Sequence, residues 1–347
     1  MKKILLLSLL ILISKETICF AQYKLESSTK INASSPDWDY IALDSASEKL
    51  FIAMRGNGVV VFDTKTNNTI QTISQSEDAN SVLIIKEKNK GYTFNADGSV
   101  TIFLLDDLKT IKRVSIGNNA DSGFYDPISD QIMITMGDSQ IAKFINANTA
   151  EITGTVSVES HKLDGSVSDE MGNFYVALRD KNMIIKIDSK RKVITGKWKT
   201  NKCREPTSLA INQTQKKIYI GCRGKDPILV VMSYLTGKIE QQVEIGRGVD
   251  GIVYDEKNKV VMTANGIDSN LVMYEVNDRN ELELKEVITT RPNARTMAYD
   301  AKKEKIYLVT AEGFINKNKK ISKKIAPFYP NQFYDNTFTV LTYSNNK

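Results

Sequence analysis

Histidine and cysteine are scarce in this chain of 347 residues, which contains one histidine, His161, and three cysteines. A serine or cysteine hydrolase places a histidine base beside its nucleophile, and the Gly-x-Ser-x-Gly elbow is absent as well. The Cys-x-x-Cys-His sequence that attaches haem is missing, and the few histidine and cysteine side chains provide no zinc ligand set. The sequence therefore gives no support for nucleophilic catalysis, haem or zinc, and we expect His161 to be a loop residue.

Long apolar runs are also lacking, apart from one at the start of the chain. Residues 4–13 are apolar except for one serine, follow two lysines and are too short to span a bilayer. Cys19 and Ala21 are the small residues expected before a signal-peptidase cut. We therefore predict a signal peptide over residues 1–21, cleavage after Ala21, a periplasmic or secreted mature protein and no membrane span. Lipid attachment at Cys19 is the less favoured alternative, because Ile18 stands where a small residue is expected.

A concentrated basic surface is missing too. The net charge is +6, and no Lys/Arg-rich face interleaved with aromatic residues occurs, so nucleic acid is not an expected partner. The tract at residues 317–324 is rich in lysine. It is either a solvated loop or a contact for an acidic surface.

A repeat, by contrast, occupies most of the chain. Residues 246–266 contain two β-rich runs, at 252–254 and 260–264, separated by the turn Asp255-Glu-Lys-Asn-Lys and closed by Asn265-Gly266. The unit recurs about every 41–45 residues, which is the length of one propeller blade. One repeated position, the first ring, precedes the first strand: Asp39, Asn80, Asp121, Asp164, Thr207, Asp250 and Arg295. A second repeated position, the second ring, closes the second strand: Arg55, Asn95, Gly137, Arg179, Arg223, Asn265 and Ala311.

Seven units predict an all-β fold, a single seven-bladed β-propeller of four-stranded blades over residues 22–347. The last unit is irregular, because residues 313–336 form an aperiodic insertion rich in lysine and asparagine that we expect to be a mobile loop. One strand follows, at 338–343, and the fourth is missing. A spare strand pattern at residues 23–31 should complete this blade, so that the N-terminal strand closes the ring and leaves no exposed edge to aggregate.

The two cysteines that remain after signal cleavage are Cys203 and Cys222. An even count in an oxidising compartment favours a disulfide. In the repeat register Cys203 precedes the first strand of its unit and Cys222 ends the second, and adjacent antiparallel strands bring these ends together. We predict a Cys203–Cys222 disulfide, with two buried thiols as the alternative.

The repeat units resemble those of the YVTN-repeat, YncE-like β-propeller family of exported bacterial proteins. Residues 50–67 read Leu-Phe-Ile-Ala-Met-Arg-Gly-Asn-Gly-Val-Val-Val-Phe-Asp-Thr-Lys-Thr-Asn, close to the family's strand, Gly-rich turn, valine-rich strand and Asp-Thr. Trp38-Asp39-Tyr40 and Gly221-Cys222-Arg223 are further matches, and the fifth unit departs from the pattern at Met232-Ser233-Tyr234. The resemblance spans the mature chain and implies the propeller fold, but it implies no particular activity.

Both rings and the insertion fall on one face of such a propeller, at the mouth of its central channel. We predict ligand binding there by the first-ring residues Asp39, Asn80, Asp121, Asp164, Thr207, Asp250 and Arg295 together with Arg55, Arg179 and Arg223. Guanidinium groups suit carboxylate or phosphate recognition. The alternative is structural: Arg295 neutralises its ring neighbours Asp250 and Asp39, and the other arginines pair with first-ring aspartates.

Asp121 and Asp164 are the candidates for a divalent-cation site, because hard cations such as calcium favour clustered carboxylates. The alternative is that they are solvated acids lining a water-filled channel. No other cofactor is predicted. The favoured function is a non-enzymatic binding module, a monomer that recognises a small polar ligand or another exported protein. A metal-assisted hydrolase or lactonase at the channel mouth is the alternative. An electron-transfer or quinoprotein-type partner is a third reading, by analogy with the fold.

Overall fold

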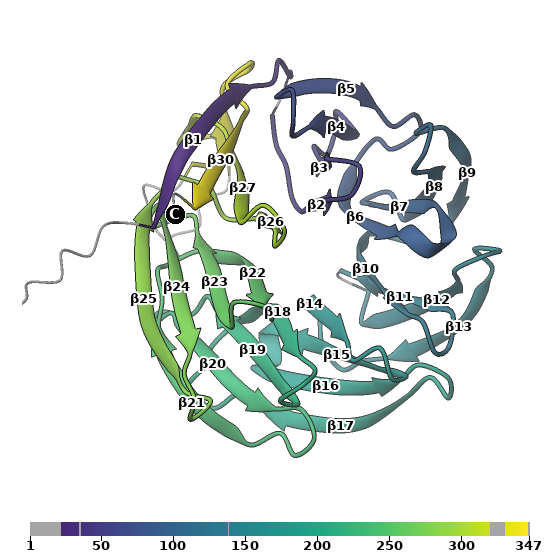
Figure 1. Cartoon of the computed structure of the whole chain (residues 1–347). Coiled ribbons are helices and arrows are strands. Elements are labelled where there is room, and N and C mark those ends of the chain that lie inside the picture. Colours follow the sequence, from purple (N-terminus) through teal and green to yellow (C-terminus); the bar gives the residue numbers. More distant parts are fainter. Residues whose placement is uncertain (1–21, 35, 138, 320–329, 346–347) are drawn as a thin grey trace, which may run out of the picture.

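The computed structural model describes residues 22–34, 36–137, 139–319 and 330–345. The predicted signal peptide, residues 1–21, lies outside the described residues. Within them, no helix is both long enough and apolar enough to cross a bilayer. Seven four-stranded antiparallel sheets are arranged in a ring, as a seven-bladed β-propeller (Figure 1).

The first four blades follow the chain, and in each of them the strands run outward from the centre in sequence order. Their bounds are β2 (Ile41–Asp44), β3 (Lys49–Ala53), β4 (Val59–Asp63) and β5 (Asn68–Thr72); β6 (Ala79–Ile85), β7 (Lys90–Asn95), β8 (Ser99–Leu104) and β9 (Thr110–Ser115); β10 (Ala120–Asp126), β11 (Gln131–Met136), β12 (Ile141–Asn146) and β13 (Ile152–Ser157); β14 (Leu163–Ser168), β15 (Asn173–Leu178), β16 (Met183–Asp188) and β17 (Val193–Lys199). Two short 3₁₀ turns interrupt this pattern, η1 (Lys86–Lys88) and η2 (Arg179–Lys181).

Blades five and six repeat the arrangement, and blade seven combines the two ends of the chain. The bounds are β18 (Pro206–Asn212), β19 (Lys217–Cys222), β20 (Ile228–Ser233) and β21 (Ile239–Glu244); β22 (Val249–Asp255), β23 (Val260–Asn265), β24 (Asn270–Val276) and β25 (Leu282–Thr289); β26 (Met297–Asp300), β27 (Lys305–Thr310), β30 (Thr339–Asn345) and β1 (Tyr23–Lys30). β1 pairs antiparallel with β30, from Tyr23 opposite Asn345 to Lys30 opposite Thr339. The predicted fold class and the closure of the ring by the N-terminal strand are therefore confirmed (Figure 1).

The apolar core lies between the blades. Seven clusters of buried side chains occupy the seven interfaces between neighbouring sheets. Aromatic rings bridge several of these interfaces. The ring centroids of Phe51 in β3 and Phe103 in β8 are 5.6 Å apart, and those of Phe144 in β12 and Phe174 in β15 are 6.0 Å apart. A strand whose two faces are both buried can carry continuous apolar residues, so β3 and β4 read as uninterrupted runs rather than as alternating ones.

The insertion in the last blade contains regular structure that the sequence did not reveal. β28 (Gly313–Phe314) pairs antiparallel with β29 (Gln332–Phe333). Phe314 and Tyr334 pack with ring centroids 4.7 Å apart, and Phe333 packs 5.0 Å from Trp38. The two ends of the insertion thus form an ordered base against the first blade, while residues 320–329 lie outside the described residues.

Candidate functional site

Each of several innermost strands begins with an irregularity at the first-ring position. In β10, Ala120 pairs with Met136 and Ser122 pairs with Thr135, so Asp121 between them has no partner on β11. The same shift in strand register leaves Asn80 in β6, Thr207 in β18 and Asp250 in β22 without a partner on the next strand. In β14 the register shift covers both Asp164 and Gly165. Such β-bulges re-aim a side chain away from the regular pleat and are common beside binding sites.

A pocket of about 680 Å³ opens at the channel mouth, and it is called the mouth pocket below. Its wall contains most of the predicted site residues: Asp39, Arg55, Asp121, Asp164, Arg179, Arg223, Asp250 and Arg295. The described part of the insertion completes the rim with Lys319, Pro330, Asn331, Gln332, Phe333 and Asp335. The volume lies within the range of about 300–1,000 Å³ that is usual for small-molecule sites.

Asn80 and Thr207 do not lie on this wall, although the repeat assigned them to the same ring. Asn80 is buried, accepts a hydrogen bond from Arg55 Nη1 at 2.7 Å and donates to the Ala120 carbonyl at 3.0 Å. Thr207 is fully buried, and its hydroxyl donates to the Glu205 carbonyl at 3.0 Å. Both side chains are therefore engaged with protein atoms behind the pocket wall.

The arginines of the wall are held by first-ring aspartates. Arg55 Nη2 lies 2.6 Å from Asp39 Oδ2, and Arg179 Nη1 lies 3.4 Å from Asp164 Oδ2. These pairings are the structural alternative that the sequence left open. They also hold the guanidinium groups on the pocket wall in fixed orientations. The same arginines therefore pair with aspartates and line the pocket.

Asp250 of blade six has two arginine partners. Arg223 Nη1 of blade five lies 3.2 Å from Asp250 Oδ1, and Arg295 Nε of blade seven lies 3.1 Å from Asp250 Oδ2. Arg295 Nη2 also donates to the Trp38 carbonyl at 2.6 Å, which ties blade seven to blade one. Arg295 thus braces the closing blade, as the structural alternative predicted for its contact with Asp250.

Tyr40 is a site residue that the sequence did not single out. It follows Asp39 in blade one, and its hydroxyl donates to Asp164 Oδ1 of blade four at 3.4 Å. Tyr40 and Asp250 line both the mouth pocket and a second cavity of about 240 Å³ deeper in the channel. The two side chains therefore form the boundary between these cavities. Asp37, Asn119 and Lys162 are further wall residues that the repeat did not indicate.

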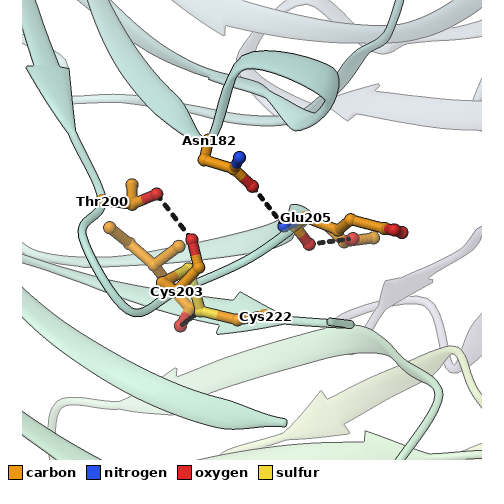
Figure 2. The surroundings of a disulfide bond; sticks show 7 residues. Asn182, Thr200, Cys203, Glu205 and Cys222 are labelled. Carbon is orange, nitrogen blue, oxygen red and sulfur yellow. Dashed lines mark hydrogen bonds between the residues drawn. A yellow bond between two sulfur atoms is a disulfide. The ribbon is translucent and has the colours of Figure 1, made fainter. Parts of the chain in front are cut away.

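The disulfide between Cys203 and Cys222 is present, as predicted, with Cα atoms 5.3 Å apart. It holds the segment before β18, where the Thr200 hydroxyl donates to the Cys203 carbonyl and the Glu205 amide donates to Asn182 Oδ1, both at 2.8 Å (Figure 2). The Glu205 carboxylate in turn accepts a hydrogen bond from Arg179 Nη2 at 2.9 Å. The disulfide thereby fixes a residue that orients an arginine of the mouth pocket.

Burial shifts the titration of the wall carboxylates. Burial raises the pKa of Asp39 to about 6 even though Arg55 and Arg295 oppose the shift. Burial, reinforced by the charge of Asp250 and opposed by Arg179, raises the pKa of Asp164 to about 7. Burial and the neighbouring charges of Asp39 and Asp164 raise the pKa of Asp121 well above its ordinary value of 3.8. Burial at the mouth thus raises the pKa of all three of these carboxyl groups.

Replacing Asp121 with asparagine is expected to stabilise the protein at pH 8, by about 0.5–2 kcal/mol. A carboxyl whose pKa is raised by folding binds its proton more tightly in the native state, so its stabilising contribution is complete below the unfolded pKa and is lost as pH rises through the folded pKa. Asp39, Asp164, Asp250 and Arg55 are the charged groups that influence it. Urea unfolding of Asp121→Asn and wild type should show a difference at pH 8 that shrinks toward pH 4.5.

Asp97→Asn is the matched control for this measurement. Although burial opposes the shift, hydrogen bonds from Ser99 and Arg113 lower the pKa of Asp97 overall, so its replacement should destabilise the protein at pH 8. An Asp121→Asn protein that is less stable than wild type at pH 8 would contradict the expected electrostatic cost of Asp121.

Among the described residues, no group of three or more histidine, cysteine, aspartate or glutamate side chains is arranged as a metal site. Calcium binding by Asp121 and Asp164 stays a prediction.

Comparison with known proteins supports the fold. No protein-family model and no curated protein matches the sequence. Among solved structures, a chain in a crystal structure of the mitotic checkpoint complex superposes with a TM-score of 0.71 and 13% identity, covering 88% of this chain and 95% of that one. Kuenenia stuttgartiensis hydrazine synthase superposes with a TM-score of 0.69 and 12% identity, covering 81% of this chain and 94% of that one. At such low identity the likeness is one of fold, and the chain is a seven-bladed β-propeller.

Proposed function

We propose that this protein is an exported, non-enzymatic binding module that holds a small polar ligand in the mouth pocket. The observation that carries the proposal is the composition of that pocket: a cavity of about 680 Å³ whose wall contains the four aspartates Asp39, Asp121, Asp164 and Asp250 and four arginines. A few converging polar groups in a concave site of this size are typical of small-molecule recognition.

A contact across the channel supports binding in the mouth pocket. Tyr40 reaches across from blade one to Asp164 of blade four, at the boundary between the mouth pocket and the deeper cavity. The four arginines of the wall are oriented by ion pairs with aspartates, which reduces the ordering that ligand binding requires.

Export and family membership belong to the same proposal. The basic and apolar start of the sequence supports a signal peptide over residues 1–21, and the Cys203–Cys222 disulfide is consistent with an extracellular compartment. The strand and turn pattern of the repeats supports membership of the YVTN-repeat, YncE-like propellers. Because propellers commonly serve as interaction modules, another exported protein is the second candidate for what the mouth face binds.

The proposal is tested by mass spectrometry of small molecules that co-purify with the protein from its native periplasm or medium. Gly137→Tyr provides a pocket-blocking variant that removes no charged residue, since Gly137 lies on the pocket wall. A Cβ at Gly137 would come within 2.3 Å of the Asn119 amide nitrogen, which the flexible Asn119 side chain can relieve. We expect a molecule that accompanies wild type and is lost from Gly137→Tyr.

A ligand retained equally by both proteins would place binding elsewhere and would contradict the mouth-pocket proposal. Cross-linking in the same preparation distinguishes the second candidate. A protein captured by wild type and lost from Gly137→Tyr would favour a protein partner over a small ligand.

A further inference from the structure

The charges of the mouth pocket are paired unevenly around the ring. Asp39 is matched by Arg55 and Asp164 by Arg179, one arginine to each aspartate. Asp250 receives both Arg223 and Arg295. The blade five to seven side of the pocket therefore has two guanidinium groups on a single carboxylate.

Asp121 of blade three is in the opposite situation. The second-ring position of its own blade is Gly137, whereas blades one and four have Arg55 and Arg179 there. The Asp121 carboxylate forms no hydrogen bond or ion pair with any residue in the described part of the chain, and Tyr40 donates to Asp164 instead. Asp121 therefore offers to the pocket a carboxylate with which no arginine of the described residues forms an ion pair.

Arg223 is the arginine best placed to offer donors to a ligand. Arg55 uses Nη1 for Asn80, Nη2 for Asp39 and Nε for Asp37. Arg179 uses Nε and Nη2 for Glu205 and Nη1 for Asp164. Arg223 uses Nη1 for Asp250, and within the described ranges its Nη2 and Nε make no further hydrogen bond.

These two features lie on different sides of one cavity. β10, which holds Asp121, faces β22 and β26 across the channel, and β22 holds the Asp250 to which Arg223 is bound (Figure 1). Among the aspartates and arginines of the wall, one side therefore has a carboxylate without an arginine partner, and the other has two arginines on one carboxylate. A ligand with a single negative charge would leave Asp121 without a partner, and one with a single positive charge would leave the donors of Arg223 unused.

We propose that the ligand is a zwitterion whose ammonium group binds Asp121 and whose carboxylate binds Arg223. This inference rests on the proposed function, and it specifies the charge and orientation of the small polar ligand. The raised pKa of Asp121 is consistent with it, because a bound ammonium would favour the ionised carboxylate that burial and the neighbouring aspartates disfavour. Arg223 likewise would gain a second carboxylate without losing Asp250, which Arg295 also holds.

The test is calorimetry with ω-amino acids from β-alanine to 8-aminooctanoate, each compared with the alkylamine and the carboxylate of the same length. We expect one chain length to bind, and to bind about tenfold to a hundredfold more tightly than either single-charge analogue, as a charge-assisted hydrogen bond predicts. Asp121→Asn should weaken binding of the amino acid by a similar factor and leave the affinity for the carboxylate analogue unchanged. Arg223→Gln should weaken binding of the amino acid and of the carboxylate analogue, and leave the affinity for the alkylamine unchanged.

Asp268→Asn and Arg247→Gln are matched controls, because this pair lies outside the mouth pocket, with Arg247 Nη2 2.6 Å from Asp268 Oδ1. Both controls should bind as wild type does, and thermal unfolding checks that all variants are folded. The zwitterion proposal is overturned if no ω-amino acid binds at millimolar concentration, or if each binds no better than its single-charge analogues. It is also overturned if calcium binds wild type but not Asp121→Asn, which would make Asp121 a cation ligand.

The two proposals fail in different ways. Single-charge ligands that bind at the mouth, and that Gly137→Tyr excludes, would end the zwitterion proposal and leave the binding function intact. Binding that is indifferent to Gly137→Tyr, Asp121→Asn and Arg223→Gln would end both.

Discussion

Deleting residues 23–30 is expected to abolish the single cooperative unfolding transition of the protein. The deletion removes β1, the fourth strand of blade seven, and with it the only strand that joins the start of the described chain to its end. β30 would then present an unpaired edge, and Tyr23, which is 7% exposed, would be lost from the cluster between blades six and seven. In urea followed by fluorescence and circular dichroism, we expect a broad transition with a lowered m-value and a tendency to aggregate.

A circular permutant provides the control that separates loss of the strand from loss of its connection. Tyr23 pairs with Asn345, so the last residues of the chain can be joined to β1 by a short glycine linker, as in a hairpin. Opening the chain after Ser34 keeps Ile31 and Ala33, both buried, attached to β1. The permutant should fold cooperatively, because it retains every strand pair. A deletion protein that unfolds as wild type does would show that β1 does not close the ring.

Most of the architecture could be predicted from the sequence because a propeller is periodic. The spacing of turn residues gives the blade count, and the incomplete last unit together with a spare strand at residues 23–31 gives the closure. The register also predicted the Cys203–Cys222 disulfide, since the repeat places both residues at adjacent strand ends. The blade count and the disulfide depend on contacts between strands that are neighbours in sequence, whereas the closure, which pairs the two ends of the chain, follows from counting the strands of the incomplete unit.

The contacts across the channel could not be predicted in this way. Tyr40 meets Asp164 from three blades away, and Arg223 pairs with the aspartate of the next blade rather than with a residue of its own. Such contacts depend on the tilt of the inner strands and on the bulges at their ends. A one-dimensional repeat does not encode these features. The same limit applies to Asn80 and Thr207, which occupy the ring position but lie behind the wall.

The difference between Asp121 and the other aspartates was nevertheless visible in the sequence. The second ring has arginine in blades one, four and five and glycine in blade three. From the sequence alone, the glycine did not show that Asp121 lacks an arginine partner, because the sequence does not tell whether an arginine pairs within its own blade or with the next one. Only the geometry shows which aspartate has two arginines and which has none.

Replacing Trp38 with alanine should destabilise the protein by about 3–5 kcal/mol, as is usual for truncation of a fully buried aromatic side chain. Trp38 is completely buried between blades one and seven. Its ring centroid lies 5.0 Å from that of Phe333 and 5.5 Å from that of Phe338, and the Arg295 guanidinium carbon lies 4.7 Å from it. The substitution would therefore remove the packing partner of the insertion and the cation–π support of a mouth arginine together. Urea unfolding measures the loss of stability.

Trp38→Phe is the informative comparison, because the indole has a buried N–H donor without a hydrogen-bond partner in the described residues, and phenylalanine has no such donor. The Nε1–H group of Trp38 is buried and has no hydrogen-bond partner among the described residues, and an unsatisfied buried donor costs about 1–3 kcal/mol. Phenylalanine loses ring volume but also removes this cost, so we expect a net change below about 1.5 kcal/mol. If Trp38→Phe proves as damaging as Trp38→Ala, the indole nitrogen must be satisfied in solution. Trp38 would then act through a polar contact rather than through the packing of its ring at the seam where the propeller closes.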